Sequence, residues 1–315
     1  MAWLRIPAAR PVAAGVQPGL LIDDTRARLQ VAALEALSVA TSRIPRAAVE
    51  PICRVVGSVW FAAAPAARAA VRANLYHVLG HAPSTSLVHA VFVSGALNYW
   101  DVLALRHMSR AQLTRLVSIR GREHIDAALA AGHGVILAGA HLSSVSLVGQ
   151  IMLALGYTMV SMVEPIEPRR VFDFFASSRA GFGLRVLPVS AAALRELLGA
   201  LRRNEMVGVI TDRDITGSGP FVDFFDAPTR FPDGLPALSV RTGAPILPSI
   251  AVRLPNGTFV AVIEPPLAIP HTGDKKRDVL LLTQAMAGRL QYHVANHPEQ
   301  WTVFQPRWPA GAARE

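Results

Sequence analysis

The sequence GVILAGAHLSSVS, residues 134–146, consists of a short apolar run followed by a histidine and three serines. An apolar run with β-branched residues is typical of a buried strand. Serine is a favoured N-cap residue, so a helix is predicted to begin near residue 143. His141 therefore lies between a strand and a helix, at the carboxyl edge of a sheet, where α/β folds bind their ligands.

The chemistry of His141 has two interpretations. An imidazole at this edge can act as a general base, because the ordinary pKa of histidine is close to neutral pH. Short motifs of this kind also occur by chance. In the alternative interpretation His141 packs in the turn, and backbone atoms form the hydrogen bonds of its ring nitrogens.

Strands and helices alternate from residue 134 onward. Strands are predicted at residues 134–138, 157–162, 184–189 and 206–211, and helices between them at residues 143–155, 168–181 and 190–203. After these come a helix at 235–242, a hairpin of strands at 246–253 and 258–263, and a helix at 278–296. Such alternation predicts an α/β fold with a central, mostly parallel sheet flanked by helices.

The residues before this alternation are predicted to be mainly helical. Residues 1–22 are rich in Ala and Pro and are predicted to be a poorly ordered N-terminus. Residues 23–315 are predicted to be a single domain. Within it, residues 23–83 form a helical part suited to associating with a membrane, and residues 84–315 form the α/β core.

The composition is apolar and basic. Hydrophobic residues make up 51% of the chain and charged residues 17%, and the formal net charge is +9. This combination favours an anionic membrane surface over nucleic acid as a partner. No uninterrupted run of about 18 apolar residues is present, and Cys53 is the only cysteine. We therefore expect a peripheral, monotopic protein on the cytoplasmic face of a bacterial inner or plasma membrane.

A second candidate site, Asp212-Arg213-Asp214, follows the predicted strand at 206–211. An aspartate at this point can orient a histidine or hold a substrate hydroxyl, and Arg213 can bind a phosphate. The alternative is a solvated loop in which the charges of the aspartates and the arginine offset each other and have no chemical role. The chain contains no phosphate-binding loop, no nucleophile elbow and no histidines at metal-ligand spacing, so no metal site is predicted.

An aromatic segment follows at residues 221–232. Aromatic clusters are more often part of a core than of a ligand site, although this one could line a tunnel for an alkyl chain. Arg230 lies between two apolar stretches of the segment. A buried arginine at that position would need a partner.

In order and spacing, four segments resemble the bacterial lysophospholipid acyltransferase superfamily. Within it they resemble the branch that contains lipid A lauroyl/myristoyl acyltransferases and phosphatidylinositol mannoside acyltransferases. The segments are the strand with His141, residues 163–164 with 179–188, residues 212–214 with 222–225 and 228–230, and residues 241–248. The ordered set is more specific than any one segment.

The resemblance implies roles for individual residues. His141 matches the catalytic histidine of the family, which deprotonates an acceptor hydroxyl for attack on the thioester of acyl-CoA or acyl carrier protein. Asp212 matches a carboxylate near the active site. The thioester is a co-substrate, and no cofactor is implied. The substrate-binding candidates, of which the arginines would hold phosphates, are Arg213, Arg179, Arg230 and Glu164.

The sequence departs from the family at two positions. The residue five positions after the catalytic histidine is normally Asp or Glu, which orients the imidazole, and here it is Ser146. A serine can accept a hydrogen bond from the ring but supplies no negative charge. A basic residue that some relatives carry after the position of Glu164 is replaced by Pro165. Either Asp212 orients the histidine instead, or the protein is slow, specialised or catalytically silent.

The sequence thus predicts an O-acyltransferase whose catalytic candidates are His141, Asp212 and Ser146. Its donor is acyl-CoA or acyl carrier protein, and its acceptor is a hydroxyl group of a membrane glycolipid or phospholipid precursor. Two alternatives stay open. The protein is a lipid-binding homologue that has lost the histidine–acid dyad, or a thioesterase that uses His141 to activate water.

Overall fold

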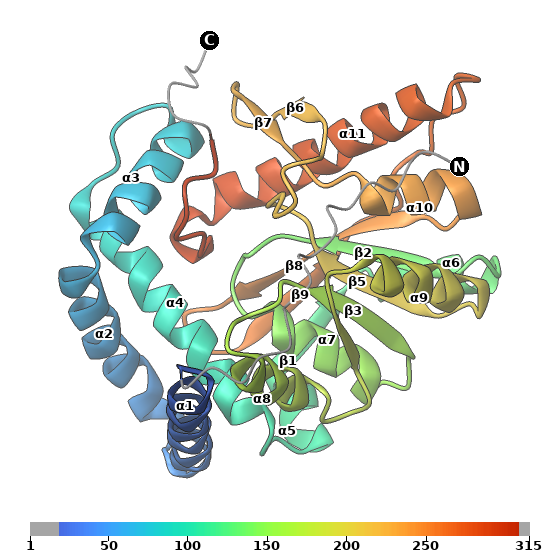
Figure 1. Ribbon diagram of the computed structural model, residues 1–315. Coiled ribbons are helices and arrows are strands. Elements are labelled where there is room, and N and C mark those ends of the chain that lie inside the picture. Colours follow the sequence, from blue (N-terminus) through green and yellow to red (C-terminus); the bar gives the residue numbers. More distant parts are fainter. Residues whose placement is uncertain (1–18, 309–315) are drawn as a thin grey trace.

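The computed structural model describes residues 19–308, with side chains from residue 25 onward (Figure 1). Its helices are α1 (Gly19–Arg43), α2 (Arg46–Ala63), α3 (Pro65–Leu79), α4 (Thr85–Leu105), α5 (Arg110–Leu116), α6 (Arg122–Ala130), α7 (Val145–Ala154), α8 (Arg169–Arg179), α9 (Ala191–Arg202), α10 (Gly234–Thr242) and α11 (Lys275–Asn296). Its strands are β1 (Val117–Arg120), β2 (Val135–Gly139), β3 (Met159–Val163), β4 (Arg185–Pro188), β5 (Met206–Ile210), β6 (Phe221–Asp223), β7 (Pro228–Arg230), β8 (Ile246–Arg253) and β9 (Phe259–Ile263).

A seven-stranded sheet forms the centre of the molecule, in the order β1-β9-β8-β2-β5-β3-β4. Its neighbouring strands are parallel except for β8 and β9, which form the predicted antiparallel hairpin. Helices lie on both faces of the sheet, because parallel strands need crossover connections (Figure 1). The predicted α/β class with a mostly parallel sheet is confirmed.

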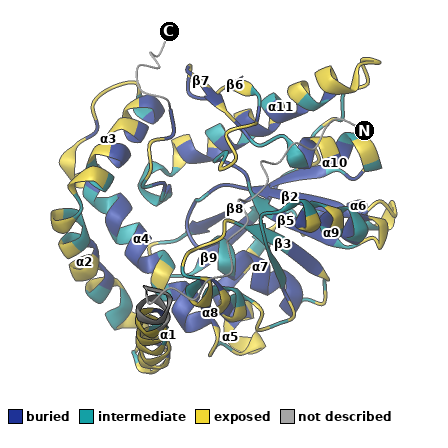
Figure 2. Cartoon of the chain, in the orientation of Figure 1, coloured by how far each residue is buried: buried dark blue, intermediate teal, exposed yellow. Residues whose placement is uncertain are grey.

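Alternating residues of the central strands pack into two different cores. On β2, Val135 and Leu137 belong to one hydrophobic core, and Ile136 and Ala138 belong to the other. Side chains of a strand alternate between its two faces, so a strand that is covered on both faces needs apolar residues at every position. All of β2 is buried, and the central strands are mostly dark blue in Figure 2. This explains the continuous apolar run in the sequence.

The N-terminal helices α2, α3 and α4 form a layer beside the sheet (Figure 1). Gly57 allows α2 to pack closely on α4, since a Cβ atom there would lie 2.7 Å from the Cα atom of Val93. Trp60 and Phe92 meet edge to face between the helices, with ring centroids 5.2 Å apart. The chain bends by 100° between α2 and α3. This layer therefore has a small apolar core of its own.

Among the described helices, α4 is long and apolar enough by length and mean hydropathy to cross a membrane, although His89, Asn98 and Asp101 interrupt its apolar residues. The bent pair of α2 and α3 passes the same test only when it is taken as one segment. Within the apolar window of α4, 56% is buried inside the molecule, and the helix contacts α1, α2, α3 and α7. A helix that is apolar on all sides is found either in a membrane or in the core of a large protein.

Four elements differ from the prediction. The loop after Asp212 contains a two-stranded antiparallel ribbon, β6 and β7, whose three-residue strands are too short for a periodic signal. Helix α5 has no counterpart in the prediction, although Ser109 and Gln112 form a capping box at its start. Helix α1 begins at Gly19 rather than at residue 23. Most of the predicted poorly ordered N-terminus, residues 1–18, lies outside the described residues.

Candidate active site

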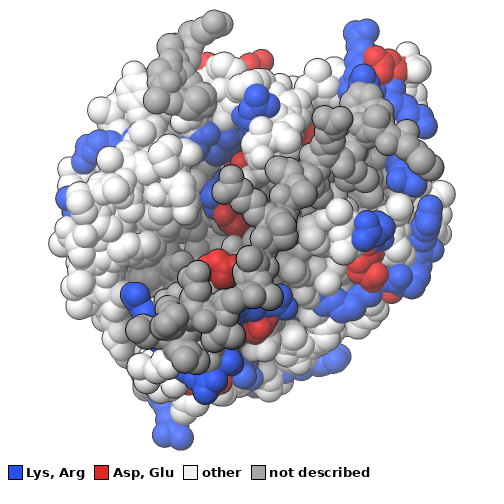
Figure 3. All heavy atoms as spheres, viewed as in Figure 1, with Lys and Arg blue, Asp and Glu red and all other residues white. Residues whose placement is uncertain are grey.

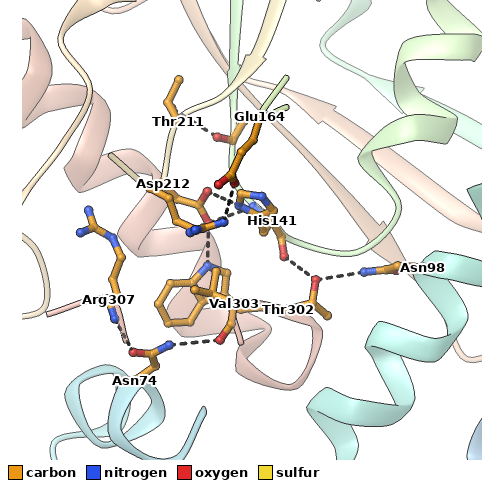
Figure 4. Close-up of polar contacts among 12 residues, drawn as sticks. Asn74, Asn98, His141, Glu164, Thr211, Asp212, Thr302, Val303 and Arg307 are labelled. Carbon is orange, nitrogen blue, oxygen red and sulfur yellow. Dashed lines mark hydrogen bonds and ion pairs between the residues drawn. The ribbon is translucent and has the colours of Figure 1, made fainter. Parts of the chain in front are cut away.

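His141 and Asp212 face each other beyond the two central strands. Gly139 and Ile210 are the last paired residues of β2 and β5, and each candidate lies two residues beyond its strand. Parallel strands end at the same edge of a sheet, so this register brings the two loops side by side. Nδ1 of His141 lies 2.6 Å from Oδ1 of Asp212 (Figure 4). The two motifs of the sequence therefore form one pair of side chains.

The carboxylate of Asp212 is fully buried and accepts three hydrogen bonds. The ring of His141 donates to Oδ1, and the backbone N–H of His141 donates to Oδ2 at 2.9 Å. The indole N–H of Trp301 donates to Oδ2 at 2.8 Å. Burial alone would raise the pKa of this carboxyl, but the charge of His141 and the three donors outweigh burial and lower the pKa to about 2. Asp212 is therefore ionised at neutral pH.

His141 is held on one side and open on the other. Its carbonyl oxygen accepts hydrogen bonds from the backbone N–H and the hydroxyl of Thr302, at 2.9 and 3.1 Å. Because Nδ1 faces Asp212, the neutral ring carries its proton there and leaves the lone pair on Nε2. The side chain is 38% exposed, and Nε2 has no hydrogen-bond partner among the described residues. A substrate can therefore reach the basic nitrogen.

Ser146 contacts an arginine instead of the histidine. Its hydroxyl accepts a hydrogen bond from Nε of Arg179 at 3.2 Å, near the start of α7. The carbonyl oxygen of Arg179 in turn accepts a hydrogen bond from the side chain of Gln150. Burial lowers the pKa of Arg179, and no carboxylate of the described residues forms an ion pair with it. Of the two ways to orient His141, this geometry selects Asp212 over Ser146.

Arg213 and Glu164 form an ion pair beside the histidine. Nη1 of Arg213 lies 3.1 Å from Oε2 of Glu164, whose side chain is half-exposed. Glu164 directly follows β3, and its carboxylate points toward His141 and Asp212 in Figure 4. Strands β2, β3 and β5 therefore each bring a candidate side chain to the same edge of the sheet.

Arg230 and Asp214 lie outside this group. The condition that a buried Arg230 would need a partner does not apply, because the residue is exposed, with its guanidinium 4.3 Å from the ring centre of Phe221. The buried arginine of this region is Arg307, which donates to the hydroxyl of Thr229. Burial lowers the pKa of Arg307 to about 10. Asp214 accepts hydrogen bonds from backbone N–H groups of its own loop, so it shapes the loop.

Trp301 and Thr302 are two residues of the site that were not predicted from the sequence. Both belong to the segment after α11, which stands out in the sequence only by its aromatic residues. Trp301 reaches Asp212 across 89 residues of the chain, and Thr302 reaches His141 across 161 residues. Hydrophobic periodicity reports local structure and contains no signal for contacts over such separations.

The side chains at this edge suit proton transfer and the binding of anions. A histidine with a free nitrogen and an ionised carboxylate can activate a hydroxyl group or a water molecule. Arginines can hold phosphate or carboxylate groups. Over the described part of the chain, no group of three or more His, Cys, Asp or Glu side chains is placed to hold a metal ion.

The chain belongs to the bacterial lipid A biosynthesis acyltransferase family, whose sequence profile matches residues 27–310. Membership of this family makes it an acyltransferase and confirms the resemblance found in the sequence.

The chain is also similar to phosphatidylinositol mannoside acyltransferases of mycobacteria. The one from Mycobacterium tuberculosis strain CDC 1551 / Oshkosh is 34% identical over 248 residues, which cover 76% of this chain and 77% of the relative. The one from strain H37Rv is 33% identical with the same coverage. The one from Mycolicibacterium smegmatis is 28% identical over 251 residues, which cover 78% of this chain and 81% of the relative.

Proposed function

We propose that the protein is an O-acyltransferase that moves a fatty acyl group from acyl-CoA or acyl carrier protein to a hydroxyl group of a membrane glycolipid or phospholipid precursor. The observation that carries the proposal is the pair of His141 and Asp212 at the carboxyl edge of β2 and β5. The names of the similar mycobacterial proteins support a phosphatidylinositol mannoside as the acceptor to test first.

The proposed reaction uses His141 as a general base. Nε2 takes the proton of the acceptor hydroxyl while the hydroxyl oxygen attacks the carbonyl carbon of the thioester. The tetrahedral adduct then collapses, the C–S bond breaks, and the imidazolium ion gives its proton to the departing thiolate. Asp212 stays ionised, stabilises the imidazolium ion and holds the ring in place. The products are an ester and a thiol, so the proposed reaction needs no cofactor.

Arginines around the pair are proposed to hold the phosphates of donor and acceptor. Arg179 suits this role because its half-buried guanidinium is held by the hydroxyl of Ser146 rather than by a carboxylate. Arg213 can exchange Glu164 for a phosphate, which would leave the carboxylate free to bind a hydroxyl of the acceptor. Arg230 is exposed and can meet a donor phosphate at the surface.

The variant Ser146→Asp is expected to retain acyl transfer within about threefold of the native rate or to raise it. The new carboxylate would pair with Arg179, and a partly exposed ion pair contributes less than about 1 kcal/mol. Asp212 would keep its hydrogen bond to Nδ1 of His141. Initial rates of ester formation measure the effect, with Ser146→Ala as the uncharged control. A more than tenfold loss in Ser146→Asp alone would show that Arg179 must stay free of a carboxylate.

The protein is proposed to bind peripherally to the cytoplasmic face of a bacterial inner or plasma membrane. On the outer face of α2, Val55, Val56 and Val59 are 64, 51 and 63% exposed. The surface over α2, α3 and α4 carries few charged side chains in Figure 3. An exposed apolar helix face favours contact with lipid, and the formal net charge of +9 favours an anionic surface.

The double variant Val55→Asp/Val59→Asp is expected to bind anionic vesicles at least about tenfold more weakly, because it places two carboxylates where apolar side chains would enter the interface. Co-sedimentation with phosphatidylglycerol vesicles measures binding. The matched control is Leu280→Asp/Leu281→Asp, which changes two exposed leucines of α11. Equal losses of vesicle binding in both double variants would show that α2 is not the specific membrane contact.

One experiment separates the three candidate functions. The protein is incubated with acyl-CoA labelled in the acyl chain and with vesicles that contain a phosphatidylinositol mannoside. Labelled glycolipid and free thiol in equal amounts support the acyltransferase. Free fatty acid without labelled lipid supports a thioesterase, which the solvent access of His141 would permit. Vesicle binding without either product supports a lipid-binding homologue.

A further inference from the structure

We propose that Trp301 is a positioning residue of the catalytic pair and acts through Asp212. The proposal rests on the proposed function, because it gives Trp301 a part in proton transfer by His141. It concerns a short segment after α11, the C-terminal strap, which comprises residues 300–303 and touches both members of the pair.

The C-terminal strap lies antiparallel to the loop that carries His141. Leu142 and Trp301 form an antiparallel bridge. Thr302 donates both its backbone N–H and its hydroxyl to the carbonyl oxygen of His141. These contacts fix the backbone at the carbonyl group of His141 and directly after it, so the position of the loop depends on the strap.

The same segment fixes the carboxylate. Oδ2 of Asp212 accepts the indole N–H of Trp301 at 2.8 Å and the backbone N–H of His141 at 2.9 Å, while Oδ1 faces the ring of His141. The indole is buried, so water does not take its place as a donor. The indole and the backbone N–H of His141, whose loop the strap holds, together keep the carboxylate from rotating, so Oδ1 stays directed at Nδ1. The proton therefore stays on Nδ1 and the lone pair on Nε2.

Helices of the N-terminal layer hold the strap in turn. The side chain of Asn98 on α4 donates to the hydroxyl of Thr302 at 3.1 Å. The side chain of Asn74 on α3 donates to the carbonyl oxygen of Val303 at 3.1 Å (Figure 4). The strap is thus positioned by the folded chain before any substrate binds, which is the condition for a preorganised site.

The variant Trp301→Phe tests the proposal, because it keeps an aromatic ring next to Phe224 and Trp308 and removes the N–H donor. We expect kcat to fall about 10- to 100-fold, the range for losing a hydrogen bond to a charged group. KM for donor and acceptor should stay within about twofold, because Trp301 acts on the base and not on binding.

A second readout is the tautomer of His141, measured by NMR on protein labelled with ¹⁵N in its histidines. We expect a single Nδ1–H tautomer in the native protein and a mixture of both tautomers in Trp301→Phe. The signals of His141 are assigned by their loss in His141→Ala. A role of Trp301 in packing alone would lower stability and leave the tautomer unchanged.

Trp308→Phe is the matched control. Its indole is buried beside the same Phe224, but its N–H has no hydrogen-bond partner among the described residues. Its kcat should change by less than about twofold. Native kcat and a native tautomer in Trp301→Phe, or equal losses in the two variants, would overturn the positioning role. Full activity in Asp212→Asn would instead reject the proposed function.

Discussion

His141→Ala is expected to lower the rate of acyl transfer about 10³- to 10⁴-fold, the upper part of the range for loss of a general base. The ring is partly exposed, and its described hydrogen bond is to Asp212, so truncation leaves the hydrophobic cores intact. Initial rates with labelled acyl-CoA and a glycolipid acceptor measure the loss. Thermal unfolding followed by circular dichroism shows whether the fold is retained.

His133→Ala serves as the control for this variant. His133 is exposed and precedes β2, at the end of the strand opposite to His141. Its removal should leave the rate within about twofold, as is usual for exposed positions without special contacts. Undiminished transfer by His141→Ala would rule out the general-base mechanism, whatever the control shows.

Asp212→Asn is expected to lower kcat about 10²- to 10⁴-fold. An amide is neutral, so it no longer stabilises the imidazolium ion. The NH₂ group of the amide can also donate to Nδ1. The ring proton would then lie on Nε2, which would no longer have the lone pair that acts as the base. The kcat of purified variant and native protein, measured at neutral pH, tests this effect. Asp214→Asn is the control, because Asp214 binds N–H groups of its own loop.

The same variant is expected to change how stability depends on pH. The pKa of Asp212 is lowered from its ordinary value of 3.8 to about 2 in the folded protein. A lowered carboxyl pKa contributes stability that is present above the unfolded pKa and is lost as pH falls through the folded pKa. The difference in unfolding free energy between native protein and Asp212→Asn should therefore shrink between about pH 4 and pH 2. Urea titrations at pH 3 and pH 7 measure it.

Much of the fold follows from patterns that are local in the sequence. The apolar run of β2 and the strands that alternate with helices predict a parallel sheet, because strands covered on both faces must be apolar throughout. His141 and Asp212 both follow such strands, so their placement at one edge could be inferred. Phe224 and Phe231 of the aromatic segment are fully buried in the core, as expected if this segment is part of the core and not of a ligand site.

The parts that sequence reasoning missed depend on contacts between distant segments. Ser146 and Arg179 meet because α7 and α8 are brought together by the sheet, and nothing local in either segment indicates it. The buried arginine is Arg307 and not Arg230, because strand β7 turns Arg230 outward. Trp301 becomes a partner of Asp212 only in the folded chain. Patterns of period 2 or 3.6 do not encode such pairings.

The hydrogen bond between Trp301 and Asp212 can form only late in the synthesis of the chain. Trp301 is translated 89 residues after Asp212 and 160 after His141. The central strands can therefore leave the ribosome before the indole exists. Under the proposed function, the imidazole of a nascent chain stays unaligned until then, and the full rate of acyl transfer is expected only after the strap has been made and has folded onto the pair.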